Sequence, residues 1–263
     1  MDKVSVIIPT WNRANTLDTA ITSILQQSYP IYEIIICDDG SDDHTHEIVA
    51  SFNNDCIKWL PDKRAGRPAV PRNRGIAVSS GDWIAFLDSD DSWLPDKIEK
   101  QLHRLHSKKR KASCTNAYIV DVAGNINGCY GSFTGHRIKF SDIILSNHVI
   151  CSSSIIHSSL VGIIEGFPEN ENLMAMEDYA LWLRVATQTD FYYINEPLVK
   201  YRDAPELSIR AKGLDTWQQR KIIFGNLLNW MEKNKTKISN KDAAIALQQY
   251  NKALSLTNSE PLS

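Results

Sequence analysis

Three carboxylates end a short apolar segment in the first half of the chain. Residues 84–87 are apolar, and Asp88, Asp90 and Asp91 follow them directly. Acidic side chains crowded at the end of a buried strand repel one another, and a hard divalent cation with oxygen ligands offsets that repulsion. Such a cation usually keeps open positions for phosphate oxygens. The pattern therefore predicts an enzyme that handles a phosphorylated, nucleotide-linked substrate.

The same acidic group has a second interpretation in local structure. Asp91 or Ser92 could cap a helix beginning near Pro95, because short polar side chains accept hydrogen bonds from the free N–H groups of a first helical turn. The two interpretations are compatible, since the metal requires only Asp88 and Asp90.

Two other polar segments follow predicted strands. Asp38 and Asp39 close the second strand, where a carboxylate could accept a hydrogen bond from a base N–H or a ribose hydroxyl. The alternative is a tight Asp-Gly-Ser turn. Residues 9–13 (Pro-Thr-Trp-Asn-Arg) close the first strand, and Trp11 there either walls a base pocket or covers the edge of the core.

Arginines and a further acidic pair add to these candidates. Arg67, Arg72 and Arg74 could neutralise a pyrophosphate or contact a base, unless they form a solvated helix face. Glu177 and Asp178 open an apolar helix, where acids suit the helix dipole. A catalytic role is the alternative for this pair.

The hydrophobic pattern predicts the elements that position these residues. Strands are expected at 4–9, 32–37, 56–60 and 83–87, alternating with helices at 15–27, 41–51 and 71–78, the second capped by Ser41 or Asp42. This alternation predicts βαβ units, an α/β fold and a mostly parallel central sheet flanked by helices. In such sheets ligands bind beyond the carboxyl ends of the strands, where the acidic residues lie.

The second half of the chain is less regular. Strands are expected at 112–122, 191–194 and 197–201, a turn-rich excursion at 124–135, and helices at 176–187, 215–233 and 241–256. The predicted organisation is a catalytic domain over 1–205, divided into two halves at 1–100 and 101–205. A C-terminal helical extension over 206–263 follows it.

Charge and cysteine content limit the partners and the compartment. The chain has 263 residues and a net charge of −2, so we expect no nucleic-acid partner. Five cysteines without a C-x-x-C pair predict reduced thiols in a cytosolic protein. The first strand begins by Val4, so we expect no signal peptide, and no apolar run approaches the ~18 residues of a membrane span.

The C-terminal extension is basic and amphipathic. From Leu207 onward nine Lys/Arg face four Asp/Glu, about +5, which leaves about −7 on the rest of the chain. Its first helix combines Arg220 and Lys221 with several large apolar residues: Trp217, Phe224, Leu227, Leu228, Trp230 and Met231. This pattern predicts either an interfacial helix on an anionic membrane surface, or a helix that packs on the catalytic domain or in a homodimer.

The order of the motifs resembles a known family. The motifs are residues 4–13 (VSVIIPTWNR), 36–41 (ICDDGS), 72–76 (RNRGI), 86–91 (FLDSDD), 166–168 (GFP) and 177–182 (EDYALW). Together they resemble the family 2 inverting glycosyltransferases of GT-A fold, of the type that builds bacterial surface polysaccharides. The resemblance covers about residues 3–202, and it implies that the half at 1–100 binds the nucleotide sugar and the half at 101–205 binds the acceptor.

The resemblance implies a nucleotide-sugar donor, a UDP-hexose or UDP-N-acetylhexosamine, with Mn²⁺ or Mg²⁺. By position, Thr10, Asp39 and Arg67 would contact the uridine. Asp88 would face the ribose and the metal, Asp90 would bind the metal, and Asp178 would be the general base. The full set of expected substrate-binding residues is Pro9, Thr10, Trp11, Arg13, Asp39, Arg67, Asn73, Asp88 and Glu177. The acceptor would be a glycan or a lipid-linked saccharide, at the cytoplasmic face of the membrane.

The chain departs from the family pattern at one point. Many relatives carry a histidine near the metal, shortly after the position of Tyr201 and Arg202, whereas Asp203, Ala204 and Pro205 follow here. The metal then has fewer protein ligands, or Asp203 replaces the histidine. A sugar-nucleotide pyrophosphorylase or a non-catalytic nucleotide-binding scaffold remains an alternative. The first would need a glycine-rich loop after the first strand, where residues 9–13 contain no glycine.

Overall fold

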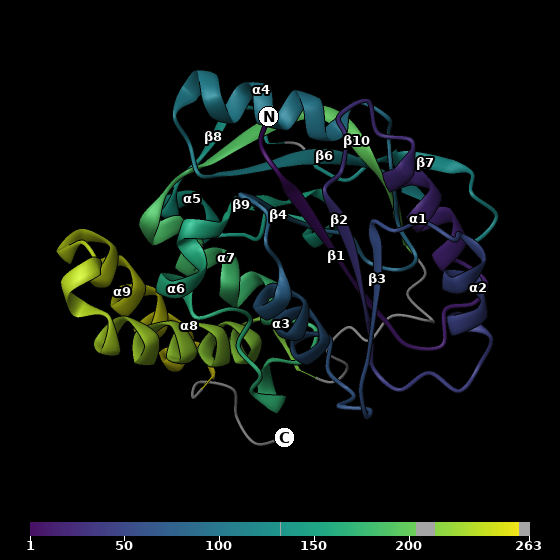
Figure 1. Ribbon diagram of the computed structural model, residues 1–263. Coiled ribbons are helices and arrows are strands. Elements are labelled where there is room, and N and C mark those ends of the chain that lie inside the picture. Colours follow the sequence, from purple (N-terminus) through teal and green to yellow (C-terminus); the bar gives the residue numbers. More distant parts are fainter. Residues whose placement is uncertain (132, 204–213, 258–263) are drawn as a thin grey trace.

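A central sheet with helices on both faces forms the molecule (Figure 1). The computed structural model describes residues 1–131, 133–203 and 214–257. The domain boundary expected at 205–206 lies outside the described residues, as do Ala204, Pro205 and the basic Arg210 and Lys212. The expected α/β class with a central sheet and a helical C-terminal region is confirmed.

The elements have the following bounds. The strands are β1 (Val4–Thr10), β2 (Glu33–Asp38), β3 (Ile57–Pro61), β4 (Trp83–Phe86), β5 (Ser92–Trp93), β6 (Ala112–Val120), β7 (Ile126–Cys129), β8 (Arg137–Ile138), β9 (Ile155–His157) and β10 (Phe191–Arg202). The α-helices are α1 (Leu17–Leu25), α2 (Thr45–Ser51), α3 (Ala69–Val78), α4 (Lys97–Lys108), α5 (Phe140–Ile143), α6 (Val161–Ile164), α7 (Glu177–Gln188), α8 (Thr216–Lys233) and α9 (Asn240–Thr257). Short 3₁₀ turns are η1 (Cys151–Ser153), η2 (Ser158–Leu160), η3 (Glu171–Leu173) and η4 (Lys235–Lys237).

The strand directions bring the ends of distant strands together. The order is β3-β2-β1-β4-β9-β6-β10-β5, with β7 beside β6 and β8 beside β10. Strands β1 to β4 pair in parallel, as do β6 and β10. Strand β9 is antiparallel to both β4 and β6, so β4 and β6 point the same way. The carboxyl ends of β1 to β4, β6 and β10 therefore share one edge, and the order reverses at β1, where a ligand crevice is expected.

Strand β1 is buried along its whole length between two apolar cores. Val6 and Ile8 belong to the core that includes Ile21 of α1 and Ile98 of α4. Ile7 belongs to the other core, which α3 and α7 to α9 cover. A strand that is buried on both faces needs apolar side chains on both faces. The sequence of β1 is therefore a largely β-branched run and does not alternate between apolar and polar residues.

Helix α4 begins later than the sequence predicted. Its first residue is Lys97, with Asp96 as the N-cap residue. The prediction that Asp91 or Ser92 caps this helix is therefore wrong. Ser92 instead lies in β5, which pairs with the end of β10.

The start of α2 also differs from the prediction. The helix begins at Thr45, so Ser41 and Asp42 do not cap it. Instead the Ser41 hydroxyl accepts the N–H of Asn12 at 2.9 Å, and the Asp42 carboxylate accepts the Asn12 side-chain amide at 2.7 Å. These contacts tie the loop after β2 to the loop after β1.

The two short strands expected near residues 191–201 form one strand. β10 runs from Phe191 to Arg202, and its register with β6 shifts on both sides of Pro197. Proline cannot donate to the strand ladder, so the sequence suggested a break, but a bulge accommodates it.

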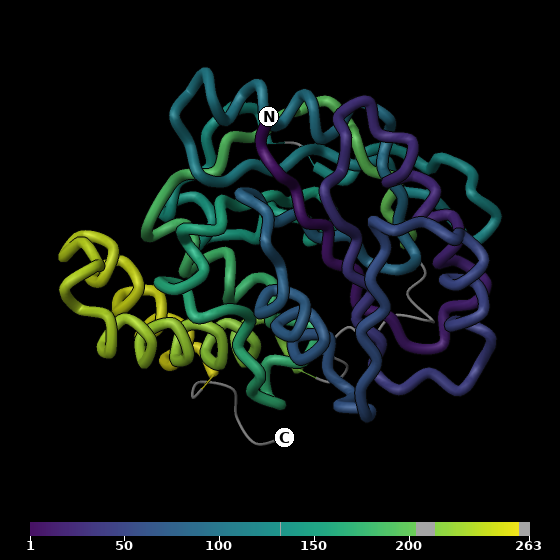
Figure 2. The backbone as a smooth tube through the Cα atoms, in the orientation of Figure 1, coloured from purple at the N-terminus to yellow at the C-terminus, as the bar shows by residue number. Residues whose placement is uncertain are grey.

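Helices α8 and α9 form a hairpin at one end of the molecule, on the left of Figure 2 and far from α1 and α2. Apolar side chains of α8 are buried against the rest of the chain: Ile223, Phe224, Leu227, Trp230 and Met231. Arg184 of α7 donates to the side chain of Asn226 at 2.8 Å. Of the two interpretations of this helix, packing on the rest of the chain is the one observed. None of the helices in the described ranges has the length and apolar character needed to cross a bilayer.

Candidate active site

A pocket of about 490 Å³ opens at the carboxyl edge of the sheet. Residues after β1, β2, β4 and β6 and at the end of β10 line it, together with the loop before α3 and the first turns of that helix. The predicted site residues in its wall are Pro9, Thr10, Trp11, Arg13, Asp39, Arg67, Asp88 and Asp90. Residues that the sequence did not single out complete it, among them Arg64, Val122, Tyr201 and Arg202.

One end of the pocket is suited to a flat, polar ring. Thr10 is buried, and its hydroxyl has no hydrogen-bond partner among the described residues. The Trp11 ring is 40% exposed, and the Arg64 guanidinium lies 3.1 Å from its centroid. A buried polar group costs free energy unless a partner satisfies it, so the Thr10 hydroxyl favours a ligand atom at this position.

Asp39 holds the loop before α3 at the same end. Its carboxylate oxygens accept the backbone N–H groups of Ala65 at 2.8 Å and Gly66 at 2.9 Å. Gly40 permits this approach, because it has a φ of +78° and an added Cβ would lie 2.9 Å from the Arg64 nitrogen. Each carboxylate oxygen has a second lone pair, so Asp39 can hold the loop and still accept a hydrogen bond from a ligand.

Asp88 and Asp90 lie together at the centre of the pocket wall. Asp88 accepts from Arg72 at 2.7 Å, and the Arg13 guanidinium lies 4.0 Å from the Asp90 carboxylate. Burial raises the pKa of Asp90, and the charge of Asp88 raises it further. Two neighbouring carboxylates, which offer oxygen donors only, fit a hard divalent cation. Within the described ranges no three His, Cys, Asp or Glu side chains gather as a metal site, so Asp203 does not form such a group with Asp88 and Asp90.

Asp91, the third acid of the group, is structural. The buried Ser152 hydroxyl donates to one of its oxygens and also accepts the backbone N–H of Asp88 at 3.0 Å. The other oxygen of Asp91 accepts the backbone N–H of Arg202 at 2.8 Å. Asp91 thus ties the turn after β4 to η1 and to the end of β10. No local sequence signal pointed to Ser152, because its partners lie 61 and 64 positions away.

Arg72 joins the pocket to the start of α7. One of its terminal nitrogens donates to Asp88 at 2.7 Å and the other to Glu177 at 2.8 Å. Arg72 and Glu177 are both buried. The second carboxylate oxygen of Glu177 is buried and has no partner among the described residues, and Glu177 does not line the pocket. Its expected contact with substrate stays a prediction.

Asp178 follows Glu177 in the first turn of α7. Burial raises its pKa to about 7, and the charge of Glu177 adds to the shift. Arg72 opposes it, as does the N–H of Tyr179, which donates to the carboxylate at 2.6 Å. A carboxylate with a pKa near neutrality accepts a proton more readily than an ordinary one, which suits a general base.

The three candidate arginines of the α3 region separate in the structure. Arg67 lines the pocket and donates to the Glu169 carbonyl at 2.8 Å. Arg72 forms the bridge described above, whereas Arg74 donates to the Asp38 carbonyl at 2.7 Å and pairs with Asp62. The idea that all three neutralise a pyrophosphate has no support from this arrangement.

Asn73 was expected to bind substrate, but it does not line the pocket. Its amide nitrogen donates to the Phe167 carbonyl at 2.8 Å and its oxygen accepts the Phe167 N–H at 2.8 Å. Gly166 is required beside it, since an added Cβ would lie 2.6 Å from the Asn73 oxygen. The geometry gives Asn73 the role of holding this loop, and its contact with substrate stays a prediction.

Comparison with known proteins extends this picture. The family described as glycosyl transferase family 2 matches residues 5–156, more than half of the chain. Among curated relatives, the UDP-Glc:α-D-GlcNAc-diphosphoundecaprenol β-1,3-glucosyltransferase WfgD of Escherichia coli is 31% identical over 202 residues, 76% of each chain. The enzyme WfaP of the same organism, described by the same activity, is 34% identical over 188 residues, 72% of each chain.

Solved structures show the same fold. Staphylococcus aureus TarS 1–349 in complex with UDP-GlcNAc superposes with a TM-score of 0.75 at 18% identity, over 96% of this chain and 71% of that one. The complex of the same protein with UDP gives a TM-score of 0.71 at 20% identity, over 98% and 72% of the two chains. The expected GT-A fold is thereby confirmed. The family match and the two relatives together place this chain in glycosyl transferase family 2, as a glycosyltransferase.

Proposed function

We propose that the protein transfers a hexose or N-acetylhexosamine from a UDP-sugar to a hydroxyl of a lipid-linked saccharide, with inversion at the anomeric carbon. The observation that carries the proposal is the bridge through Arg72. It links Asp88, in the wall of a pocket suited to a nucleotide, to Glu177, which stands beside the carboxylate of Asp178. The names of the two Escherichia coli relatives support the donor and acceptor classes.

The pocket residues would bind and orient the donor. The base would lie at the end that contains Thr10, Trp11 and Asp39, where the buried hydroxyl and the carboxylate supply polar contacts. We also assign Arg13 and Arg67 to donor binding, because both are positively charged and line the pocket. Glu177 is buried and accepts from Arg72, so we assign it to holding that arginine, and its direct contact with the sugar stays a prediction.

Asp178 would act as the general base. It takes the proton of the acceptor hydroxyl as that oxygen forms a bond to the anomeric carbon, and the bond from this carbon to the UDP oxygen breaks. The electron pair leaves with UDP, and the new bond forms on the opposite face of the sugar. The proton remains on the carboxylate of Asp178 until solvent accepts it.

Asp88 and Asp90 would hold Mn²⁺ or Mg²⁺. When bound, such an ion stabilises the negative charge that develops on the departing diphosphate. Asp203, which was expected to replace the histidine of relatives, forms no group of three with these carboxylates, so we propose that the protein supplies two ligands.

The acceptor class implies work at the cytoplasmic face of a membrane. The buried apolar residues of α8 are not available for membrane contact. We therefore assign such contact to exposed lysines near the α8–α9 turn, among them Lys233, Lys235, Lys237 and Lys241. A homodimer remains a proposal without a specific surface.

A donor screen tests the proposal. The protein is incubated with Mn²⁺ or Mg²⁺, a panel of UDP-, GDP-, CMP- and dTDP-sugars, and a synthetic lipid-diphosphate N-acetylglucosamine acceptor. Nucleotide release and product mass are measured. Asp90→Ala tests the metal role, and Asp55→Ala removes an exposed carboxylate elsewhere as the matched control.

Transfer from one UDP-sugar, lost in Asp90→Ala but kept in Asp55→Ala, supports the proposal. NMR of the product then decides whether the anomeric configuration is inverted. UDP binding without transfer would point to a different acceptor. No nucleotide binding at all would contradict the proposed donor and favour a scaffold role.

A further inference from the structure

Arg72 holds two carboxylates that come from distant parts of the chain. Asp88 lies 16 positions after it and Glu177 lies 105 positions after it. Both ion pairs are short, at 2.7 and 2.8 Å, and the Arg72 side chain is only 6% exposed. A planar guanidinium can bind two carboxylates at fixed relative positions, which a lysine ammonium cannot do.

We propose that Arg72 is a positioning residue: by holding Asp88 and Glu177 at once, it fixes the first turn of α7, and with it Asp178, against the bound donor. The inference rests on the proposed function, because it assigns Asp178 to the acceptor proton. If the inference holds, the position of Asp178 on the acceptor side depends on the position of Asp88 on the donor side.

A second contact from outside also holds the first turn of α7, because the Tyr179 hydroxyl donates to the Ile143 carbonyl at 2.8 Å. The helix supplies little of this support itself. Its N-cap residue, Met176, makes no side-chain cap, and Asp178 accepts from the N–H of its own neighbour, Tyr179. Ala175 precedes the cap with a φ of +63°, an uncommon conformation for a residue other than glycine. The turn is therefore held in a conformation that the local sequence does not favour, so contacts from outside must stabilise it.

Arg72 itself is held firmly. Its guanidinium lies 5.2 Å from the centroid of the Phe167 ring, and Asn73 clamps the backbone of Phe167 from the same helix, α3. Arg72 is thus fixed on α3 and bound to Asp88 after β4, so it can hold the start of α7 at a set position relative to the donor site.

Substitution of Arg72 tests the inference. We expect Arg72→Met to lower the transfer kcat about 100-fold, the effect of misplacing a reacting group by about 1 Å, and to change the donor KM far less. Arg72→Lys keeps the charge but reaches only one carboxylate, so its kcat should be intermediate. The matched control is Arg184→Met, another buried arginine, which belongs to α7 itself and binds the Ile164 carbonyl and Asn226. This control should lower the melting temperature and leave kcat within about twofold.

A double variant separates positioning from a general loss of structure. If Arg72 acts through Glu177, then Arg72→Met should cost little further kcat in a Glu177→Gln background, because the link is already broken. Hydrogen exchange of the free protein gives a readout that needs no turnover. Exchange at residues 176–180 should accelerate in Arg72→Met but not in Arg184→Met.

The outcomes distinguish this inference from the proposed function. A wild type that transfers no sugar counts against the proposed function, whereas hydrogen exchange still tests the link. Unchanged exchange at 176–180 in Arg72→Met would overturn the inference. An unchanged kcat in Arg72→Met would also overturn it, as would an equal loss of kcat in Arg184→Met. The third contrary outcome is a double variant whose kcat falls by the product of the fold-losses of Arg72→Met and Glu177→Gln.

Discussion

The proposed donor side, in the pocket wall, and the proposed base side, at the start of α7, are built in different ways. On the donor side, Thr10, Asp39 and Asp88 each lie at or directly after the end of a strand, and parallel pairing brings these ends to one edge. On the base side, Asp178 depends on one helix, α7, which other segments hold in place. The first arrangement follows from the order of strands, and the second follows from tertiary packing.

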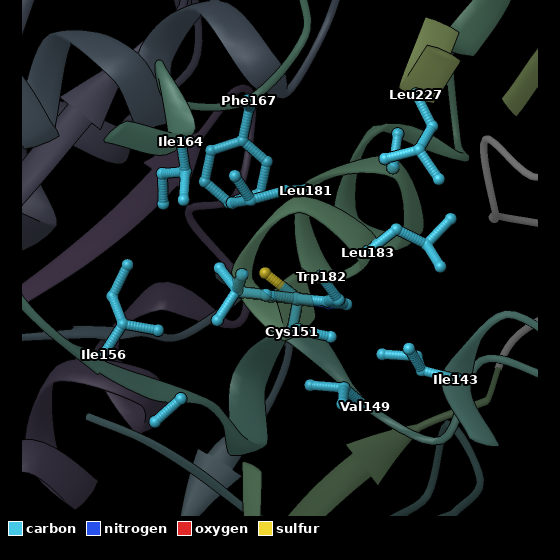
Figure 3. Packing of buried hydrophobic residues seen from close by; sticks show 14 of the residues in the cluster. Ile143, Val149, Cys151, Ile156, Ile164, Phe167, Leu181, Trp182, Leu183 and Leu227 are labelled. Atoms are coloured by element: carbon cyan, nitrogen blue, oxygen red, sulfur yellow. The ribbon is translucent and has the colours of Figure 1, made fainter. Parts of the chain in front are cut away.

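The packing of α7 shows the difference most clearly. Trp182 lies one turn after Asp178 and is fully buried, with Phe86, Phe167 and Phe191 within 6.0 Å between ring centroids. Figure 3 shows Trp182 in this core together with Cys151 and Val149. Helix α8 covers the same core. We therefore expect changes on the donor side to affect binding, changes at Asp178 to affect turnover, and changes behind α7 to affect stability.

The largest expected effect is on turnover at the base side. Asp178→Asn removes the proton acceptor with little change of shape, so the transfer kcat should fall about 1,000-fold. The affinity for UDP, measured by calorimetry, should stay within about twofold, because the lost interaction belongs to the transition state. A large loss of UDP affinity would show that Asp178 also belongs to the donor side and would remove the distinction.

The core behind α7 gives the next largest effect. Phe224 of α8 is fully buried, and Phe224→Ala should lower the free energy of unfolding by about 3–5 kcal/mol through the lost contacts and the cavity. Leu247→Ala on α9 is the control, because Leu247 is 51% exposed and should cost less than about 0.5 kcal/mol. Urea denaturation measures both. A Phe224→Ala protein of unchanged stability would revive the interpretation of α8 as an interfacial helix.

The donor-side acids provide a third test. Asp90→Ala removes a proposed metal ligand, so the transfer rate at saturating Mn²⁺ should fall about 100-fold, and more Mn²⁺ should be needed for half-maximal rate. Asp91→Asn is the informative companion. Asp91 binds Ser152 and the Arg202 backbone, so we expect lower thermal stability and an unchanged Mn²⁺ requirement. If Asp91→Asn raised the Mn²⁺ requirement and Asp90→Ala lowered only the thermal stability, Asp91 would be the metal ligand and Asp90 the structural acid.

The sequence predicted which strand-end acids line the pocket better than it predicted the contacts that hold α7, for a physical reason. Acids directly after an apolar strand form a local pattern, so Asp39, Asp88 and Asp90 could be assigned from neighbouring residues. The role of Asp91 depends on Ser152, 61 positions away, and no periodicity contains that contact. Arg72 could be identified as a candidate, but its two partners could not.

Long-range contacts, which the sequence pattern does not contain, also decided how the C-terminal helices are packed. The bounds predicted for them, 215–233 and 241–256, lie within one residue of α8 and α9 at each end. Helical spacing of apolar residues predicts an amphipathic helix, yet it does not state what covers the apolar face. The contacts of α8 with α7 and α9 supplied that answer.

The pH dependence of turnover sharpens the comparison further. A base works in its deprotonated form, and the pKa of Asp178 is raised to about 7. The transfer kcat should therefore level off above about pH 8 and fall about tenfold per unit well below pH 7. Glu177→Gln removes a neighbouring negative charge that raises this pKa, so the profile should shift to lower pH. A shift to higher pH, or none, would count against the proposed coupling of the two acids.

The smallest expected effect concerns the base-binding end of the donor side. Stacking of a nucleobase on an aromatic ring contributes about 1–3 kcal/mol, and the lower end of this range is expected for the part-exposed Trp11. Trp11→Ala should therefore weaken UDP binding about five- to tenfold, with kcat nearly unchanged. The Arg64 guanidinium covers one face of the same ring, at 3.1 Å from its centroid. Because this contact orients the indole, Arg64→Ala should also weaken UDP binding, and the double variant should bind no worse than Trp11→Ala alone. Tighter binding in Arg64→Ala would show instead that the guanidinium occupies the place of the base and must leave before the donor binds.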